Sequence, residues 1–313
     1  MLYFTKLVMK KESPKWLNSQ LYPFEHHYIA LSAGDMHYID EGSGDIILFV
    51  HGTPTWSFLY RDFIKELSKS YRCIAVDHLG FGLSEKPGNL AGRPQDHAQN
   101  LSEFIQKLDL KNITLVVHDF GGPIGLGAAL DQPERIRQVV MFNTWLWGTA
   151  SNPAVKKIDK IARSWLGKFL YLNLNFSPKF LLKKGFADKS RLPREIHQQY
   201  ICPFPTKTSR QSLLQLAKSL YSSSIWYQEQ WETLDVLAEK PWLILWGTKD
   251  EFITPDYLER WEKRLPHAEV HTYDCGHFVQ EERSTKAINI LEGFIRLKKS
   301  TSLKMTVKAT SEK

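Results

Sequence analysis

The fold is decided by the stretch LVVHDFGG at residues 115–122. An apolar run ends at His118, and Asp119 and Phe120 then lead through two glycines into a helical stretch. Such a sharp turn from strand to helix needs glycine just after the reactive position, because the helix must pass close to the strand. The turn predicts that the side chain of Asp119 lies at the C-terminal end of a sheet. There it stands above a helix N-terminus, which favours an anion.

Short apolar runs alternate with helical stretches on both sides of this turn. The runs are Ile46–Val50, Arg72–Asp77, Ile113–His118, Val139–Asn143, Trp242–Trp246 and Ala268–Tyr273. They are apolar throughout, as expected for strands that helices cover on both faces. The alternation predicts an α/β fold with a doubly wound, mostly parallel sheet. Residues 27–41 read as a hairpin in front of it.

The alternation breaks off over residues 146–224, which are rich in Lys, Phe, Trp, Tyr and Leu and have helical periodicity. We predict that this stretch is a helical cap over the strand ends. The core would then consist of residues 20–145 and 225–297. The aromatic residues of the cap are expected to line a pocket as well as to fill its own core.

The net charge of +7 is concentrated at the C-terminus. Residues 298–313 contain five lysines and one glutamate, and so supply +4 of it. We interpret them as a basic, flexible, solvated tail rather than as an arm for nucleic acid. No basic motif interleaved with aromatics occurs elsewhere, so no nucleic-acid partner is expected. The composition, 42% hydrophobic and 24% charged, allows a large core.

The three cysteines (Cys73, Cys202 and Cys275) are widely spaced and form no C-x-x-C pair. This argues against a disulfide framework and a zinc site, and we expect neither a metal nor a cofactor. The N-terminus lacks the long apolar core of a signal peptide, and no later run is as long as a membrane span. The sequence therefore predicts a cytoplasmic protein without a membrane partner, as a monomer or weak homodimer.

A second segment, HGTPTWSFLYR at residues 51–61, follows the strand IILFV directly. A loop of this kind can present a backbone N–H toward the reactive side chain of the sharp turn. Together with the N–H of the residue after that side chain, it makes an oxyanion hole. The donors would be the N–H groups of Thr53 and Phe120. The alternative is an ordinary turn containing Gly and Pro.

The remaining two segments supply an acid and a base. His277 lies in DCGHFVQEE, after the last predicted strand, and is the candidate general base. Asp250 lies in WGTKDEF and is placed to orient it, with Asp274 as a weaker rival. Taken singly, Asp119 could be a helix N-cap and the other two could be loop residues. Taken together in this chain order, they predict a carboxylate nucleophile with its base and orienting acid.

These segments together resemble the haloalkane dehalogenases and their epoxide-hydrolase neighbours in the α/β-hydrolase superfamily. The resemblance covers about residues 20–297 and is carried by HGTPTWSFLYR, DHLGFGLSEKP, LVVHD and GHFVQEE. It implies an α/β-hydrolase sheet with a helical cap. It also implies a hydrolase that cleaves the carbon–halogen bond of a small apolar substrate, with water, through an alkyl ester on Asp119.

The sequence departs from that family at two positions. Phe120 stands where such dehalogenases usually carry a tryptophan that donates to the halide, and Thr53 stands where many carry asparagine. Stabilisation of a halide would then depend on a tryptophan of the cap region, which some relatives use. The candidate pocket residues are Trp165, Trp226, Trp231 and Tyr171.

Three other functions remain open. An epoxide hydrolase would use the same nucleophile with tyrosine donors, for which Tyr171, Tyr200, Tyr221 and Tyr227 are available. Another α/β-hydrolase could act on a small apolar substrate such as a lactone, whose carboxylate would be the leaving group. A non-catalytic small-molecule binder ranks last, because a binder has no reason to keep Asp119, Asp250 and His277 in register.

Overall fold

A computed structural model describes residues 12–88 and 92–311 of the chain. Its centre is an 8-stranded sheet with the order β1-β2-β4-β3-β5-β6-β7-β8. The strands are β1 (His27–Leu31), β2 (Gly34–Glu41), β3 (Ile46–Val50), β4 (Arg72–Val76), β5 (Ile113–Val117), β6 (Ile136–Phe142), β7 (Trp242–Gly247) and β8 (Glu269–Tyr273). Strand β2 runs antiparallel to β1 and β4, and all other pairs are parallel. The predicted mostly parallel sheet and its leading hairpin are confirmed.

Helices cover both faces of this sheet. Side chains alternate along each strand, so Leu48 and Val50 of β3 face one way while Ile47 and Phe49 face the other. The first face packs against α2 (Pro94–Lys107), α3 (Gly121–Asp131) and α11 (Pro255–Arg264). The second packs against α1 (Arg61–Leu67), α12 (Val279–Glu282) and α13 (Ser284–Ser311). Because both faces are buried, the strands read as continuous apolar runs.

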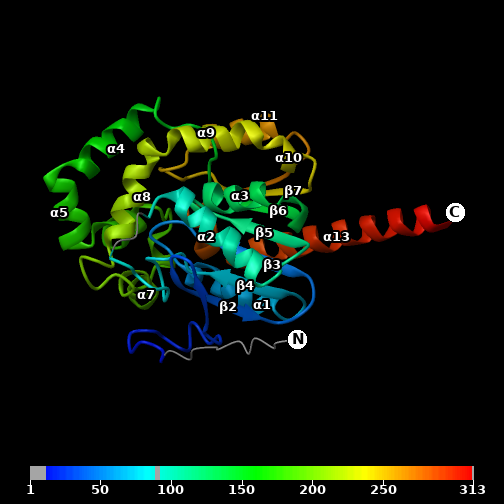
Figure 1. Ribbon diagram of the computed structural model, residues 1–313, viewed down its shortest axis with the longest axis horizontal. Coiled ribbons are helices and arrows are strands. Elements are labelled where there is room, and N and C mark those ends of the chain that lie inside the picture. Colours follow the sequence, from blue (N-terminus) through cyan, green and yellow to red (C-terminus); the bar gives the residue numbers. More distant parts are fainter. Residues whose placement is uncertain (1–11, 89–91, 312–313) are drawn as a thin grey trace.

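Helices alone connect β6 to β7. The structure describes every residue from 143 to 241, and none of them lies in a strand. The helices are α4 (Pro153–Arg163), α5 (Trp165–Leu174), α6 (Leu182–Lys184), α7 (Arg194–Ile201), α8 (Gln211–Ser222), α9 (Ser224–Thr233) and α10 (Asp235–Ala238). Figure 1 shows α4, α5, α7 and α8 gathered at one end of the molecule, while α9 and α10 run along the core. The boundary between cap and core stays a prediction.

The C-terminal segment, predicted as a flexible tail, is helical. Helix α13 continues to Ser311 and projects from the body of the molecule (Figure 1). The sequence analysis did not predict this helix, and the flexibility of the tail stays a prediction. No glycine or proline follows Gly293, so nothing in the sequence stops the helix. Among the described residues, no helix combines the length and the apolar character needed to cross a bilayer.

Candidate active site

Asp119 sits at the sharp turn between β5 and α3 that the sequence predicts. Its backbone has a φ of +51°, a left-handed conformation that costs roughly 1–3 kcal/mol for a residue with a side chain. The turn is held from outside, since Asp119 N–H donates to Asn143 O at 3.0 Å and the Thr144 hydroxyl donates to Asp119 O at 2.6 Å. A Cβ on Gly121 would lie 2.3 Å from Val50 O, so the close passage of helix and strand requires glycine there.

Backbone N–H groups hold the carboxylate of Asp119. The Thr53 N–H donates to its Oδ1 at 2.7 Å, and the Phe120 N–H also donates to the carboxylate. Burial raises the pKa of Asp119, and the charge of His277 together with these N–H groups offsets only part of that rise. The structure thus brings both predicted oxyanion donors to the predicted nucleophile. A Cβ on Gly52 would lie 2.3 Å from Oδ1, so the loop has no room for a larger residue.

His277 and Asp250 complete the arrangement. The His277 Nδ1 lies 2.6 Å from Asp250 Oδ2, and its Nε2 lies 3.6 Å from Asp119 Oδ2. The other oxygen of Asp250 accepts from the N–H groups of Phe252 and Ile253 at 2.8 and 3.1 Å. Burial lowers the pKa of His277, but the charge and hydrogen bond of Asp250 outweigh it, so the pKa is raised overall.

The rival carboxylate lies elsewhere. The side chain of Asp274 is 73% exposed and pairs with Lys249 at 2.7 Å, away from the histidine. Asp250 is therefore the carboxylate that the structure pairs with His277.

Asn143, at the end of β6, fixes Asp250 in turn. Its amide oxygen accepts from Gly247 N at 2.8 Å, and its Nδ2 donates to Gly247 O at 3.0 Å. The same Nδ2 donates to Asp250 Oδ2 at 3.0 Å. The bonds with Gly247 fix which end of the amide faces Asp250. No pattern in the sequence indicated this supporting role.

The loop of His277 is tied to the cap region. The backbone N–H of His277 donates to Gly185 O at 2.7 Å. The buried carboxylate of Glu282 accepts from Gly276 N at 2.9 Å and from Asp188 N at 2.8 Å. One side chain therefore binds both the histidine loop and the segment after α6. Displacement of that segment would also displace the base.

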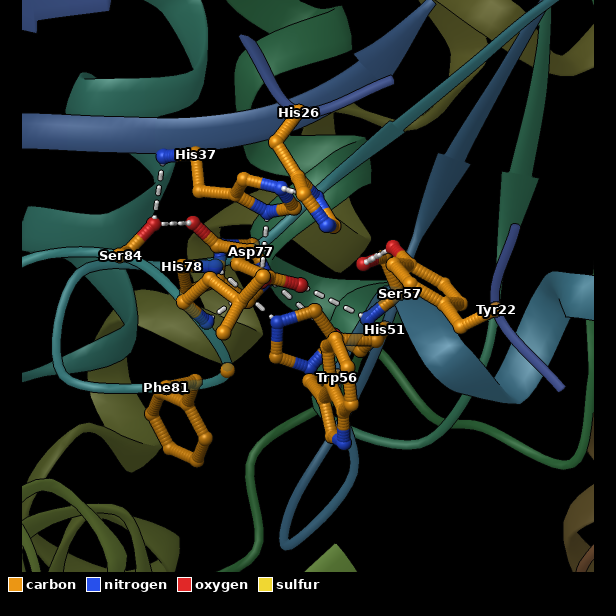
Figure 2. Close-up of polar contacts among 12 residues, drawn as sticks. Tyr22, His26, His37, His51, Trp56, Ser57, Asp77, His78, Phe81 and Ser84 are labelled. Atoms are coloured by element: carbon orange, nitrogen blue, oxygen red, sulfur yellow. Dashed lines mark hydrogen bonds and ion pairs between the residues drawn. The ribbon is translucent and has the colours of Figure 1, made fainter. Parts of the chain in front are cut away.

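The Thr53 loop rests on a buried network around Asp77 (Figure 2). Asp77 Oδ1 accepts from Ser57 N at 2.8 Å, while Oδ2 accepts from Leu83 N and faces His37 Nδ1, each at 2.8 Å. Burial alone would raise the pKa of Asp77, but His37, His51 and the Leu83 N–H lower it well below its usual range. The carboxylate therefore stays ionised, and its hydrogen bond from Ser57 N holds the loop in place. No pattern in the sequence indicated this network.

His51 begins the loop but has a structural role. Its Nδ1 lies 2.7 Å from Gly52 O, and its Nε2 accepts from His78 N at 3.0 Å. The rings of His51 and His78 lie 4.4 Å apart between centroids, and Figure 2 labels both close to Asp77. Burial lowers the pKa of His51, which agrees with a neutral ring that donates from Nδ1 and accepts at Nε2. Both nitrogens are thus used in shaping the loop that presents Thr53.

The four candidate pocket residues lie in different surroundings. The side chain of Trp165 is 79% exposed on α5, so its assignment to the pocket is wrong. Helical periodicity could not show which face of α5 turns inward. Trp226 packs on α3, where its Cζ2 would lie 3.0 Å from a Cβ at Gly127. Trp231 packs edge-on against Trp147, with centroids 5.2 Å apart. Tyr171 is half-buried against the core, and burial raises its pKa to about 12.

An indole that the sequence analysis missed lies beside Phe120. Trp145 is 3% exposed, and its ring meets the Phe120 ring edge-on at 4.9 Å between centroids. Its Nε1 is buried and finds no hydrogen-bond partner in the described part of the chain. The hydroxyl of Thr53 is buried and unpartnered in the same way. Buried donors usually have partners, so both groups are free to donate to a ligand that reaches them. The signal available in the sequence was that Trp145 comes shortly after the predicted strand Val139–Asn143.

Comparisons with known proteins agree with this fold. A family model described as "alpha/beta hydrolase fold" matches residues 45–284. "Haloalkane dehalogenase 2" of Mycobacterium tuberculosis is 35% identical over 279 residues, which cover 88% of this chain and 96% of the relative. A "Cis-3-alkyl-4-alkyloxetan-2-one decarboxylase" of Shewanella oneidensis is 33% identical over 286 residues, covering 88% and 89%. The haloalkane dehalogenase DatA of Agrobacterium tumefaciens C58 superposes with a TM-score of 0.80 at 27% identity, covering 90% of this chain and 99% of that one.

Proposed function

The chain belongs to the α/β-hydrolase family and is a haloalkane dehalogenase-like hydrolase, and from this premise we propose that it cleaves carbon–halogen bonds through an ester on Asp119. One observation carries the proposal. The buried Asp119 carboxylate is held by the Thr53 and Phe120 N–H groups and faces His277 Nε2 at 3.6 Å. This arrangement suits attack by a carboxylate followed by hydrolysis of the resulting ester.

In the first step, Asp119 Oδ2 attacks the sp³ carbon that carries the halogen. The new carbon–oxygen bond forms as the carbon–halogen bond breaks, and the halide leaves with the bonding electron pair. Oδ2 is the attacking atom because Oδ1 is already bound by the Thr53 N–H at 2.7 Å. The unpartnered Trp145 N–H and Thr53 O–H are the donors available to the halide. They would replace the indole that residue 120 does not provide.

In the second step, His277 takes a proton from water, and the water oxygen attacks the carbonyl carbon of the ester. Negative charge develops on Oδ1, where each N–H donor stabilises it by about 3–4 kcal/mol in comparable sites. The tetrahedral intermediate then expels the alcohol, to which His277 returns the proton. Asp250 orients the ring through the Nδ1 contact of 2.6 Å and stabilises its cationic form.

A lactone is the second candidate substrate, because Phe120 offers no halide donor and one relative is named as an oxetan-2-one decarboxylase. The same attack on a ring carbon would open a strained lactone and free a carboxylate that stays on the molecule. Loss of that carboxylate as carbon dioxide would then form an alkene as the bond to Asp119 breaks, which restores the Asp119 carboxylate.

The epoxide alternative has less support from the tyrosines. Tyr200 donates to Glu281, and Tyr221 is 40% exposed. Tyr227 is buried, and burial raises its pKa, with a smaller upward contribution from the charge of Asp119. It is therefore the donor on which an epoxide hydrolase would most depend.

A substrate panel tests the proposal. Purified protein is offered bromoalkanes, terminal epoxides and a 3,4-dialkyl-oxetan-2-one, and free halide, diol and carbon dioxide are measured. The variant Asp119→Asn serves as the control for background reaction. We expect bromide release that depends on Asp119. Turnover of epoxide or oxetanone alone would overturn the halide assignment. Ligand binding without turnover of any of them would favour the binder.

A further inference from the structure

Helix α5 turns apolar side chains toward solvent. Trp165, Leu166 and Phe169 share one face by their spacing and are 79%, 47% and 45% exposed. The opposite side carries Gly167, where a Cβ would lie 1.9 Å from Ile161 O of α4. The helix is therefore packed tightly through its small residue and presents its large apolar residues outward. A soluble helix normally has the reverse arrangement.

Helix α4 continues this surface. Its apolar face is only partly covered, since Val155 and Ala162 are buried while Ile158 and Ile161 remain 40% and 44% exposed. The two helices meet at Ser164, so the exposed residues gather around one corner. The cap-tip surface is defined here as Ile158, Ile161, Trp165, Leu166 and Phe169. Figure 1 shows α4 and α5 at the outer edge of the molecule, at the end opposite to the C-terminus.

Positive charge surrounds the cap-tip surface. Residues 146–224 contain fourteen Lys and Arg against three Asp and Glu, a net charge of +11 in a chain whose total is +7. The exposed lysines of α4 and α5 make no ion pair with any described residue; they are Lys156, Lys157, Lys160 and Lys168. Lys218 of α8 lies within range of the same charges. Burial is the largest cause that lowers its pKa, and the charges of Lys168 and Arg163 lower it further. The tail therefore explains only part of the basic character of the protein.

We propose that the cap-tip surface docks the protein on the surface of an anionic phospholipid bilayer. Exposed Trp, Phe and Leu insert at the boundary between headgroups and acyl chains, while the lysines reach the anionic headgroups with their long side chains. Each basic residue near such a surface strengthens binding by about fivefold. The inference rests on this surface and not on the reaction at Asp119.

A bilayer fits better than the other possible occupants. A second copy of this chain would bring together two copies of residues 146–224, each with a net charge of +11, and like charges oppose that contact. An acidic protein would satisfy the lysines, but it would have to provide a matching apolar patch for a protruding corner. A fluid bilayer adapts to the shape of the cap-tip surface. It supplies an apolar interior for the exposed side chains and anionic headgroups for the lysines. The inference replaces the expectation, drawn from the sequence, that the protein has no membrane partner.

Vesicle co-sedimentation of the full chain tests the charge. The probes are phosphatidylcholine vesicles with and without phosphatidylglycerol, at low and high salt. We expect binding to the anionic vesicles that weakens with salt. The substitutions Lys156→Gln, Lys160→Gln and Lys168→Gln together should weaken it about a hundredfold. The matched control changes Lys69, Lys111 and Lys263 of the core to glutamine, and it should bind as wild type.

Insertion of the apolar corner is tested separately. Lipids with brominated acyl chains quench an indole that enters the bilayer, so wild-type fluorescence should fall on vesicle binding. The variant Trp165→Phe should keep its binding and lose most of this quenching. The combined variant Trp165→Ser, Leu166→Ser and Phe169→Ser should weaken binding at least tenfold. Val236→Ser, which changes a residue 57% exposed on α10, is the control. Circular dichroism and activity confirm that each variant is folded.

Several outcomes would overturn the proposal. Binding that Lys298→Gln, Lys299→Gln and Lys304→Gln abolish, and the cap substitutions do not, would assign it to the C-terminal helix. Binding to heparin or an acidic protein without binding to vesicles would make the surface a polyanion site. Self-association that Trp165→Ser removes, in the absence of vesicle binding, would make it an interface between copies. Vesicle binding without quenching would exclude insertion.

Discussion

The substitution Asp250→Asn should separate the two chemical steps. In the wild type, Asp250 Oδ1 accepts from two backbone N–H groups, and Oδ2 accepts from Asn143 Nδ2 at 3.0 Å and from His277 Nδ1 at 2.6 Å. The oxygen of the new amide would stay with the backbone donors. The NH2 group of the same amide would then face Asn143 and His277. Asn143 cannot turn over without breaking both of its bonds to Gly247.

The expected loss follows from the tautomer of His277. An amide NH2 at the position of Oδ2 favours a ring that accepts at Nδ1 and carries its hydrogen on Nε2. That ring cannot take a proton from water. In a comparable triad the same change lowers the rate about 10⁴-fold, or roughly 5.5 kcal/mol of barrier. The loss should fall on ester hydrolysis alone, because an ionised carboxylate attacks without a base.

Rapid-quench measurement of bromide release gives the readout. Asp250→Asn should release about one equivalent of bromide per active site at close to the wild-type rate, and then turn over about 10⁴-fold more slowly. Asn143→Ala, which removes one hydrogen bond to the same carboxylate, should cost about tenfold to a hundredfold. Steady-state turnover of Asp250→Asn within tenfold of wild type would refute this reasoning. Equal slowing of both phases would refute it as well.

Three further predictions concern the same site. Only neutral His277 accepts a proton, so the rate of ester hydrolysis should fall as the pH drops through its raised pKa, above the ordinary value of 6.5, in single-turnover experiments. Trp145→Phe should slow bromide release about tenfold or more and leave ester hydrolysis unchanged, since it removes one donor to a developing charge. Phe120→Trp should speed bromide release about tenfold by adding a donor; a decrease with an unchanged melting temperature would show that the halide lies elsewhere.

The sequence predicted the parts of the fold that depend on local pattern. The apolar runs predicted the parallel strands. The glycines after Asp119 predicted the turn, because steric limits on close backbone approach act within a few residues. The order of Asp119, Asp250 and His277 along the chain also predicted that they meet at one edge of the sheet. Each of them follows a strand, and parallel strands end at the same edge.

Features that depend on long-range packing were not predictable. Periodicity showed that α4 and α5 are helices, yet their apolar residues could equally have faced the core, so Trp165 was placed in the pocket. The roles of Asn143 and Trp145 depend on how β6 lies beside β5 and β7. The network around Asp77 joins residues that are far apart in sequence. The C-terminal helix was missed because lysine-rich composition indicates solvation, which a projecting helix also satisfies.

Trapping of the ester tests the central claim most directly. His277→Phe removes the base but keeps an aromatic ring of similar size, and Asp119 remains free to attack. After incubation with a bromoalkane that the wild type turns over, intact-protein and peptide mass spectrometry should show one alkyl group on Asp119 and none in the double variant that also carries Asp119→Asn. An unmodified Asp119 in His277→Phe, under conditions where bromide is released, would contradict the account.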